Sequence, residues 1–295
     1  MRCRLGQIVV FVTSSLLVGS PHLHAQSSDL TASCHDSVAS DDNNSSGPEI
    51  SIVDVTFSGS LQMPIPEQEQ ISNSIKQKTH GKSLDDVTEM GLERVRAGWQ
   101  DRGYFKVKIT GETRTLTSSP ASQRIALSVH VDEGSQYKLS HITFTNNKAI
   151  TSVETLRGFF PIVNGEIFSR EKIGKGLENL QKAYGELGYV NFTPVPDTYF
   201  DDENKVITVE INLDEGKQFR VGSVNVLGVE ESLREELLKT FTVGQIYSRS
   251  LWETSLLKYA AMFPECDCAT HERLRLDEKS GTVMLTLDFR PCAAQ

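Results

Sequence analysis

The chain has 295 residues, of which 38% are hydrophobic and 23% are charged, and this balance indicates folded domains rather than a disordered chain. Its formal net charge of −9 excludes a general attraction for phosphate, so nucleic acid is an unfavourable partner and an anionic lipid surface would repel it. The length is sufficient for two or three ordinary domains.

Residues 1–25 have the pattern of a secretory signal peptide. Arg2 and Arg4 give a positive start, an apolar run follows, and the segment ends at the small residue Ala25. A retained membrane anchor is an alternative, because the uncharged stretch is close to the ~17–18 residues that a spanning helix needs. A lipid anchor at Cys34 is a weaker alternative, since no apolar residue stands three positions before it. We expect cleavage and export to an oxidising compartment.

Residues 26–49 are rich in Ser, Asp and Asn and predict a flexible linker. A strand–helix–helix–strand–strand pattern then occurs three times, and the middle copy shows it most clearly. There, strand-like "YKLSHITFTN" precedes a helix for which Thr151 and Glu154 fit a capping box. A longer helix follows, with apolar residues spaced by four and three positions, and two strands complete the copy.

Repeated motifs mark the junctions between the copies. "VDEGSQYKLSHITFTNN" at 131–147 matches "LDEGKQFRVGSVNVLGV" at 213–229, and "GEIFSR" matches "GQIYSR" further along. A period near 80 residues indicates tandem domains rather than the short turns of a solenoid. The sequence therefore predicts an α+β chain of three tandem β-α-α-β-β domains, each a three-stranded sheet with two helices on one face. Their expected bounds are 50–134, 135–216 and 217–292.

The array resembles the POTRA domains of the BamA family, the outer-membrane protein assembly factors. The resemblance rests on G-x-I-[FY]-S-R before the second helix, Gly-Tyr after it and Glu-Gly at the end of the last strand, and covers roughly residues 50–291. The third copy departs from it, with "MFPECDCAT" in place of the Gly-Tyr turn and "LDFRPC" at its end. The resemblance implies a periplasmic location at the outer membrane. It also implies unfolded outer-membrane proteins, assembly-complex subunits or a separately encoded membrane barrel as partners.

The sequence contains no recognisable catalytic or cofactor-binding motif. The histidines are scattered, and neither a zinc-protease helix motif, a serine nucleophile elbow nor a phosphate loop occurs. We therefore expect no enzymatic activity and no cofactor.

The cysteines near the C-terminus form the one cluster with potential chemistry. Cys266, Cys268 and Cys292 could bind a metal, but their C-x-C spacing is tighter than common zinc motifs, and export favours a disulfide. If residues 269–276 and 282–290 form a hairpin, Cys266 lies closer to Cys292 than Cys268 does. We therefore predict a Cys266–Cys292 disulfide.

The strand after the second helix of each copy should lie at a sheet edge, where free N–H and C=O groups can accept an extended peptide. In the second copy, Pro194 and Pro196 weaken this edge. The first copy has no proline there, and we predict that partner strands bind along six residues, namely Phe105, Lys106, Val107, Lys108, Ile109 and Thr110. Because lysines also guard edges against aggregation, simple edge protection is an alternative.

The sequence thus favours a periplasmic polypeptide-binding module for outer-membrane protein assembly that binds client or partner strands by β-augmentation. The alternative is a structural docking arm in a secretion or envelope complex that binds one folded partner. An enzyme is a third class, for which the sequence offers no supporting motif.

Overall fold

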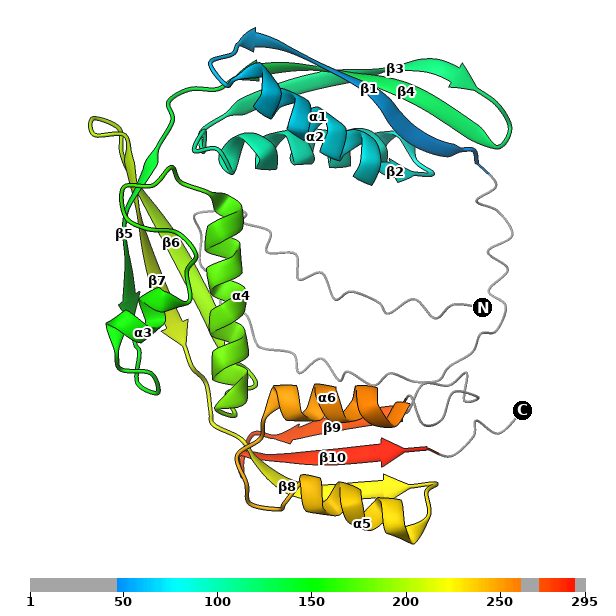
Figure 1. Ribbon diagram of the computed structural model, residues 1–295, viewed down its shortest axis with the longest axis vertical. Coiled ribbons are helices and arrows are strands. Elements are labelled where there is room, and N and C mark those ends of the chain that lie inside the picture. Colours follow the sequence, from blue (N-terminus) through cyan, green and yellow to red (C-terminus); the bar gives the residue numbers. More distant parts are fainter. Residues whose placement is uncertain (1–46, 261–270, 290–295) are drawn as a thin grey trace. The chain divides into compact units, whose positions relative to one another are not determined.

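The computed structural model describes residues 47–260 and 271–289, which form three successive domains, each with its own sheet and hydrophobic core (Figure 1). The expected signal peptide, nearly all of the expected linker, Cys266 and Cys292 lie outside these ranges, so the disulfide stays a prediction. Within the described ranges, no helix is long and apolar enough to cross a membrane.

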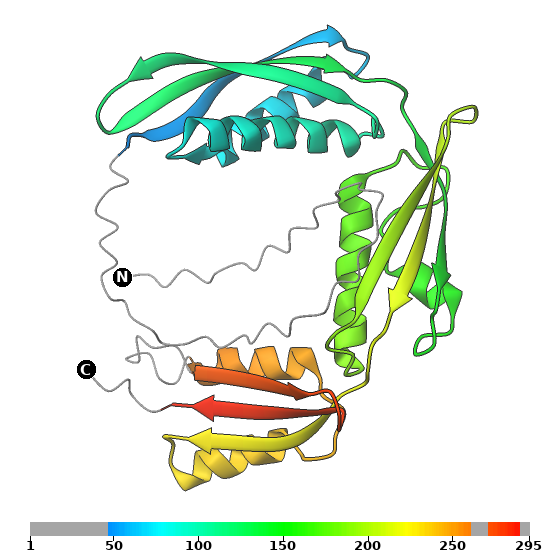
Figure 2. The same ribbon diagram turned by 180° about the vertical axis from the view of Figure 1, so that it is seen from behind.

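The first domain is a sheet with the strand order β2-β1-β4-β3, in which β1 runs parallel to β4 and β3 runs antiparallel to it. Alternate residues of the central strand β4, such as Ile125 and Leu127, are fully buried. Helices α1 and α2 cover that face and leave the other face bare (Figures 1 and 2). The elements are β1 (Glu49–Ser60), α1 (Ile65–Lys78), β2 (His80–Gly81), α2 (Leu84–Gln100), β3 (Lys108–Ser118) and β4 (Ser122–Asp132).

The second domain repeats this plan with the strand order β5-β7-β6. Ile207, Val209 and Ile211 of the central strand β7 are fully buried against the core that α3 and α4 complete. Helix α3 is capped by Ser152, whose side chain accepts a hydrogen bond from the Thr155 N–H, so the expected Thr151 cap is one residue too early. The elements are β5 (Lys138–Thr145), α3 (Val153–Gly158), α4 (Arg170–Glu186), β6 (Thr193–Asp201) and β7 (Val206–Asp214).

The third domain has the strand order β8-β10-β9. In its hairpin Thr282 pairs with Asp277, which differs by one or two residues from the register expected from the sequence. Cys266, Cys268 and Cys292 lie outside the described residues, so this register does not test the predicted disulfide. The elements are β8 (Arg220–Leu227), α5 (Glu231–Thr240), α6 (Arg249–Ala260), β9 (His271–Asp277) and β10 (Thr282–Asp288).

The predicted α+β class and the β-α-α-β-β order are confirmed in all three domains. The first sheet has one strand that the sequence did not predict, the two-residue β2, which pairs antiparallel with the start of β1. Single bridges between Lys138 and Ile167, and between Arg220 and Ile246, occupy the same place in the other two sheets.

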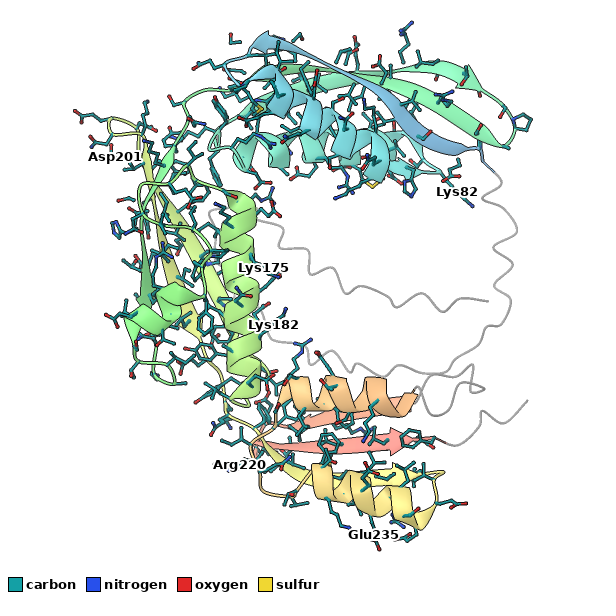
Figure 3. All side chains as sticks on the ribbon, viewed as in Figure 1. Lys82, Lys175, Lys182, Asp201, Arg220 and Glu235 are labelled. Atoms are coloured by element: carbon teal, nitrogen blue, oxygen red, sulfur yellow. The ribbon has the colours of Figure 1, made fainter. Side chains whose placement is uncertain are left out.

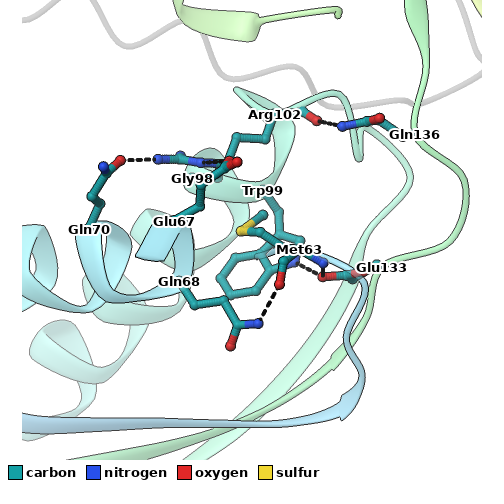
Figure 4. A network of polar contacts seen from close by, with 9 residues as sticks. All are labelled: Met63, Glu67, Gln68, Gln70, Gly98, Trp99, Arg102, Glu133 and Gln136. Atoms are coloured by element: carbon teal, nitrogen blue, oxygen red, sulfur yellow. Dashed lines mark hydrogen bonds and ion pairs between the residues drawn. The ribbon is translucent and has the colours of Figure 1, made fainter. Parts of the chain in front are cut away.

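The Glu-Gly motif that ends the first repeat places a buried carboxylate at the end of β4. Glu133 is fully buried and accepts hydrogen bonds from the backbone N–H groups of Gln62 (2.5 Å) and Met63 (3.1 Å) and from the Trp99 indole (2.9 Å) (Figure 4). One side chain thus joins the end of β4 to the loop before α1 and to the last turn of α2.

The second domain has the same network around Glu215. Its carboxylate accepts the N–H groups of Lys148 (2.8 Å) and Ala149 (2.9 Å) and the Tyr184 hydroxyl (3.0 Å). Burial and then the hydrogen bond to Glu215 raise the pKa of the Tyr184 phenol. The repeated "DEG" is therefore a structural motif, because a buried carboxylate is tolerated only where donors surround it.

We expect Glu133→Gln to lower the free energy of unfolding of the first domain by about 2 kcal/mol, since an amide nitrogen cannot accept the bonds that the carboxylate accepts. Urea unfolding followed by Trp99 emission measures this, in a Trp252→Phe background that removes the second tryptophan. Glu89→Gln, at an exposed position of α2, is the matched control and should change little. Equal effects of the two substitutions would contradict the anchoring role.

Helix α4 contains two glycines in very different surroundings. A Cβ atom at Gly176 would lie 2.0 Å from the Phe160 ring, whereas one at Gly174 would meet nothing within 4 Å. Gly176 therefore permits close packing of the helix on the core, while Gly174 only lowers helix propensity.

We expect the same substitution at these two positions to have opposite effects on the second domain. Gly176→Ala should destabilise it by about 1–3 kcal/mol through overpacking, and Gly174→Ala should stabilise it by about 0.5–1 kcal/mol. Amide hydrogen exchange in α4 and β7 is the measurement. A shift in the same direction for both variants would show that the packing against Phe160 is not limiting.

Candidate functional site: the free edge of β3

Each sheet has one strand at its end that no other described strand or bridge covers. These strands are β3, β6 and β9, each of which follows the second helix of its domain. The opposite end of each sheet is closed by β2 or by one of the two single bridges. The described domains therefore offer three candidate edges for an added strand.

The three edges differ in length and in proline content. Strand β6 has nine residues and carries Pro194 and Pro196, which lack N–H groups and so remove two donors from its free side. Strand β9 has seven residues. Strand β3 has eleven residues and no proline, which makes it the longest proline-free edge of the three.

The hairpin that joins β3 to β4 fixes which backbone groups of β3 point outward. At its end the Ser119 N–H donates to the Ser122 carbonyl (2.8 Å), and the ladder contains one irregularity, between Thr115 and Thr117. Alternation along the strand then directs the N–H groups of even-numbered residues from 108 to 114 toward β4. The N–H and C=O groups of Ile109, Gly111 and Thr113 point away from the sheet.

The two faces of β3 carry different side chains. Exposed polar and charged residues occupy the bare face of the sheet, namely Lys108, Thr110, Glu112 and Arg114. On the helix-covered side, Gly111 has no side chain, and Leu92 of α2 fills the space beside it. A Cβ atom at Gly111 would lie 2.7 Å from Leu92 Cδ2. The Thr113 hydroxyl lies 3.4 Å from that of Thr88. An added strand would therefore meet charges on one face and α2 on the other.

The structure places only half of the six predicted edge residues in this strand. Lys108, Ile109 and Thr110 belong to β3, but Phe105, Lys106 and Val107 form a turn before it. Val107 is buried, and its N–H donates to the Tyr104 carbonyl (3.1 Å). The observed strand thus begins at Lys108, three residues after the start of the expected strand "FKVKIT". It continues to Ser118, beyond the end of the predicted segment.

Phe105 and Lys106 contact the second domain. The Phe105 ring packs on Phe168 (5.3 Å between centroids) and Phe200 (5.4 Å) and joins the core of that domain. Lys106 donates to the carboxylate of Asp202 (2.7 Å), in the turn that follows Asp201 (Figure 3), and its Nζ lies 4.5 Å from the Phe200 ring centroid. These contacts were not predictable from the sequence, because a buried aromatic residue and a paired lysine alternate in the same way as edge residues do.

Electrostatics at this contact follow from the hydrogen bonds. The bond to Asp202 raises the pKa of the Lys106 ammonium, and the same bond, with one from Tyr137, lowers the pKa of the Asp202 carboxyl. Burial, and then the bond to Asp202, raises the pKa of the Tyr137 phenol. All three groups keep their ordinary charge at neutral pH, so they hold the turn rather than perform chemistry.

The next junction repeats the arrangement at equivalent positions. Val190 takes the place of Phe105 and packs on the third core, and the side chain of Asn191 donates to Glu278 (2.5 Å) in the following hairpin turn. The carbonyls of Gly103 and Gly188 accept the N–H of the aromatic residue that begins the next domain, both at 2.8 Å. The Gly-Tyr motif is therefore part of the junction.

At each junction, a carboxylate at the end of the second helix of one domain also contacts the start of the second helix of the following domain. Asp101 accepts the Glu171 N–H (2.7 Å), and Glu186 accepts the Ser250 N–H (2.8 Å). Burial raises the pKa of Asp101. Burial acts in the same direction on Glu186, but its hydrogen bonds to Ser248 and Ser250 outweigh this and lower its pKa.

No cluster of three or more His, Cys, Asp or Glu side chains suited to a metal occurs among the described residues. Backbone groups on the edge strands β3, β6 and β9 remain candidates to engage a partner.

Comparison with known proteins agrees with the repeat. Residues 137–216 match the family model "POTRA: Surface antigen variable number repeat". A candidate outer membrane protein assembly factor of Treponema pallidum (strain Nichols) is 26% identical over 185 residues, 60% of this chain and 22% of that protein. The assembly factor BamA of Neisseria meningitidis serogroup B is 27% identical over 161 residues, 50% of this chain and 20% of that protein.

These matches cover about a fifth of the relatives' own length. Among solved structures, Haemophilus influenzae BamA POTRA3-5 superposes with a TM-score of 0.56 at 18% identity, over 82% of this chain and 96% of that one, which supports the fold. The second domain thus matches the POTRA family model, and the three described domains share the fold of the BamA POTRA domains.

Proposed function

We propose that the chain is a periplasmic, outer-membrane-associated module that binds polypeptides for outer-membrane protein assembly, and that β3 is its binding edge. The observation that carries the proposal is the eleven-residue, proline-free edge of β3. An extended peptide that pairs with this edge gains main-chain hydrogen bonds independently of its side chains. Unfolded outer-membrane proteins or assembly-complex subunits are the partners that the relatives' names support.

The proposed edge differs from the segment expected from the sequence. Since Phe105 and Lys106 are held by the second domain, the part of the strand available to a partner begins at Lys108. The outward groups of Ile109, Gly111 and Thr113 are the donors and acceptors for an added strand, and Leu92 of α2 borders it on the helix side. A partner strand with apolar residues on alternate positions fits this border.

Pull-down from envelope extract distinguishes the proposed module from a docking arm. Recovery of many unfolded outer-membrane proteins supports the module, whereas one stoichiometric folded partner supports the alternative.

We expect Thr113→Pro to weaken binding of a ten-residue peptide with alternating aromatic residues by about tenfold or more. Proline removes one outward N–H and obstructs the adjacent pairing. Thr113→Val is the matched control, since it removes the same hydroxyl contact with Thr88 but keeps the N–H. Amide chemical shifts of the first domain measure both the binding and the integrity of the fold.

Unchanged affinity in the proline variant, with no peptide-induced shifts along Lys108–Thr115, would show that β3 is not the binding edge.

A further inference from the structure

The charges of β3 have different neighbours across the ladder with β4. Lys108 lies opposite Asp132, which is of opposite charge, while Glu112 lies opposite Ser128 and Arg114 opposite Ala126. Glu112 and Arg114 are both exposed on the bare face of the sheet. An added strand that places a base beside Glu112 and an acid beside Arg114 would therefore gain two favourable cross-strand pairs.

The sequence of β3 itself meets this requirement. We propose that a second copy of this chain pairs with β3 edge to edge, antiparallel, about a two-fold axis at Thr113. In this register Glu112 lies opposite Arg114 of the second copy, and Arg114 lies opposite Glu112 of the second copy. A two-fold interface forms each such contact twice, so the self-complementary charges act together.

The backbone geometry of β3 suits this register. The outward groups of Gly111, Thr113 and Thr115 form the hydrogen-bonded pairs, with Thr113 paired to itself across the axis. Glu112 and Arg114 then occupy the non-hydrogen-bonded pairs, where opposite Cα atoms are only about 4.5 Å apart and side chains approach most closely. The irregularity between Thr115 and Thr117 ends the ladder on one side.

Other two-fold registers are less favourable. An axis at Gly111 sets Lys108 against Arg114, and an axis at Glu112 sets two carboxylates against each other, and both arrangements repel. An axis at Thr110 pairs Lys108 with Glu112, but Lys108 already faces Asp132 within its own sheet. The register about Thr113 pairs Glu112 and Arg114, the two charged residues of β3 that lie opposite uncharged residues of β4.

The pairing occupies the same backbone groups that a client strand would use. Self-association would therefore protect a long edge from non-specific aggregation, and a client would bind the monomer. Self-association does not depend on client binding, and it is measured as the binding of the chain to a second copy of itself.

The test uses the full exported chain, with free thiols blocked, in two single variants, Glu112→Arg and Arg114→Glu. We expect the wild type to dimerise weakly, with a dissociation constant between micromolar and millimolar in sedimentation velocity. Each variant alone sets like charges against each other and should weaken the dimer by about fivefold or more. An equimolar mixture of the two should regain the dimer, since each chain then meets the opposite charge.

Lys108→Glu is the matched control, with the same change of charge on the same face of β3 but outside the paired segment. It should leave the dimer unchanged. A monomeric wild type, single variants that dimerise as the wild type does, or a mixture that stays monomeric would each overturn the proposal. Loss of the dimer in Lys108→Glu but not in Arg114→Glu would assign the axis to Thr110 and refute the proposed register.

Discussion

A buried glutamate at the end of the last strand is the constraint on which the first two domains depend. A carboxylate in an apolar interior is stable only with several donors around it, and Glu133 and Glu215 each have three. These donors come from the loop before the first helix and from an aromatic residue near the end of the second helix. The bonds therefore fix both helices against the sheet, and with them the turn that leads into the edge strand.

In the third domain, an uncharged residue holds the end of the last strand. Phe289 occupies the position of Glu215, is buried in the core, and its N–H donates to the Leu227 carbonyl (2.9 Å), which continues the pairing with β8. An aromatic side chain replaces three polar contacts with apolar burial. The sequence departure at "LDFRPC" is thus a change in how the end of the last strand is held.

Periodic features of the sequence predicted the order of the elements, because glycine turns and helix-face spacing are set locally. Features decided by neighbouring domains or by turn geometry were not predictable in this way. The start of β3 depends on Phe105 reaching another core, which no local pattern reveals. The register of the last hairpin depends on its turn, in which the Asp277 carboxylate accepts the Lys279 N–H (2.9 Å). The first residue of α3 was misplaced because Thr151 and Ser152 are adjacent and both residue types are suitable helix caps.

Because Phe105 and Val190 each complete the core of the domain that follows, the repeating segment of sequence and the unit that packs as one body are offset. A gain or loss of one domain by recombination at a Glu-Gly boundary would deliver to each core a side chain shaped for a different one. The residue at this position is phenylalanine at one junction and valine at the other. Because protein interiors are close-packed, a new junction requires that this one residue fit the core that it enters.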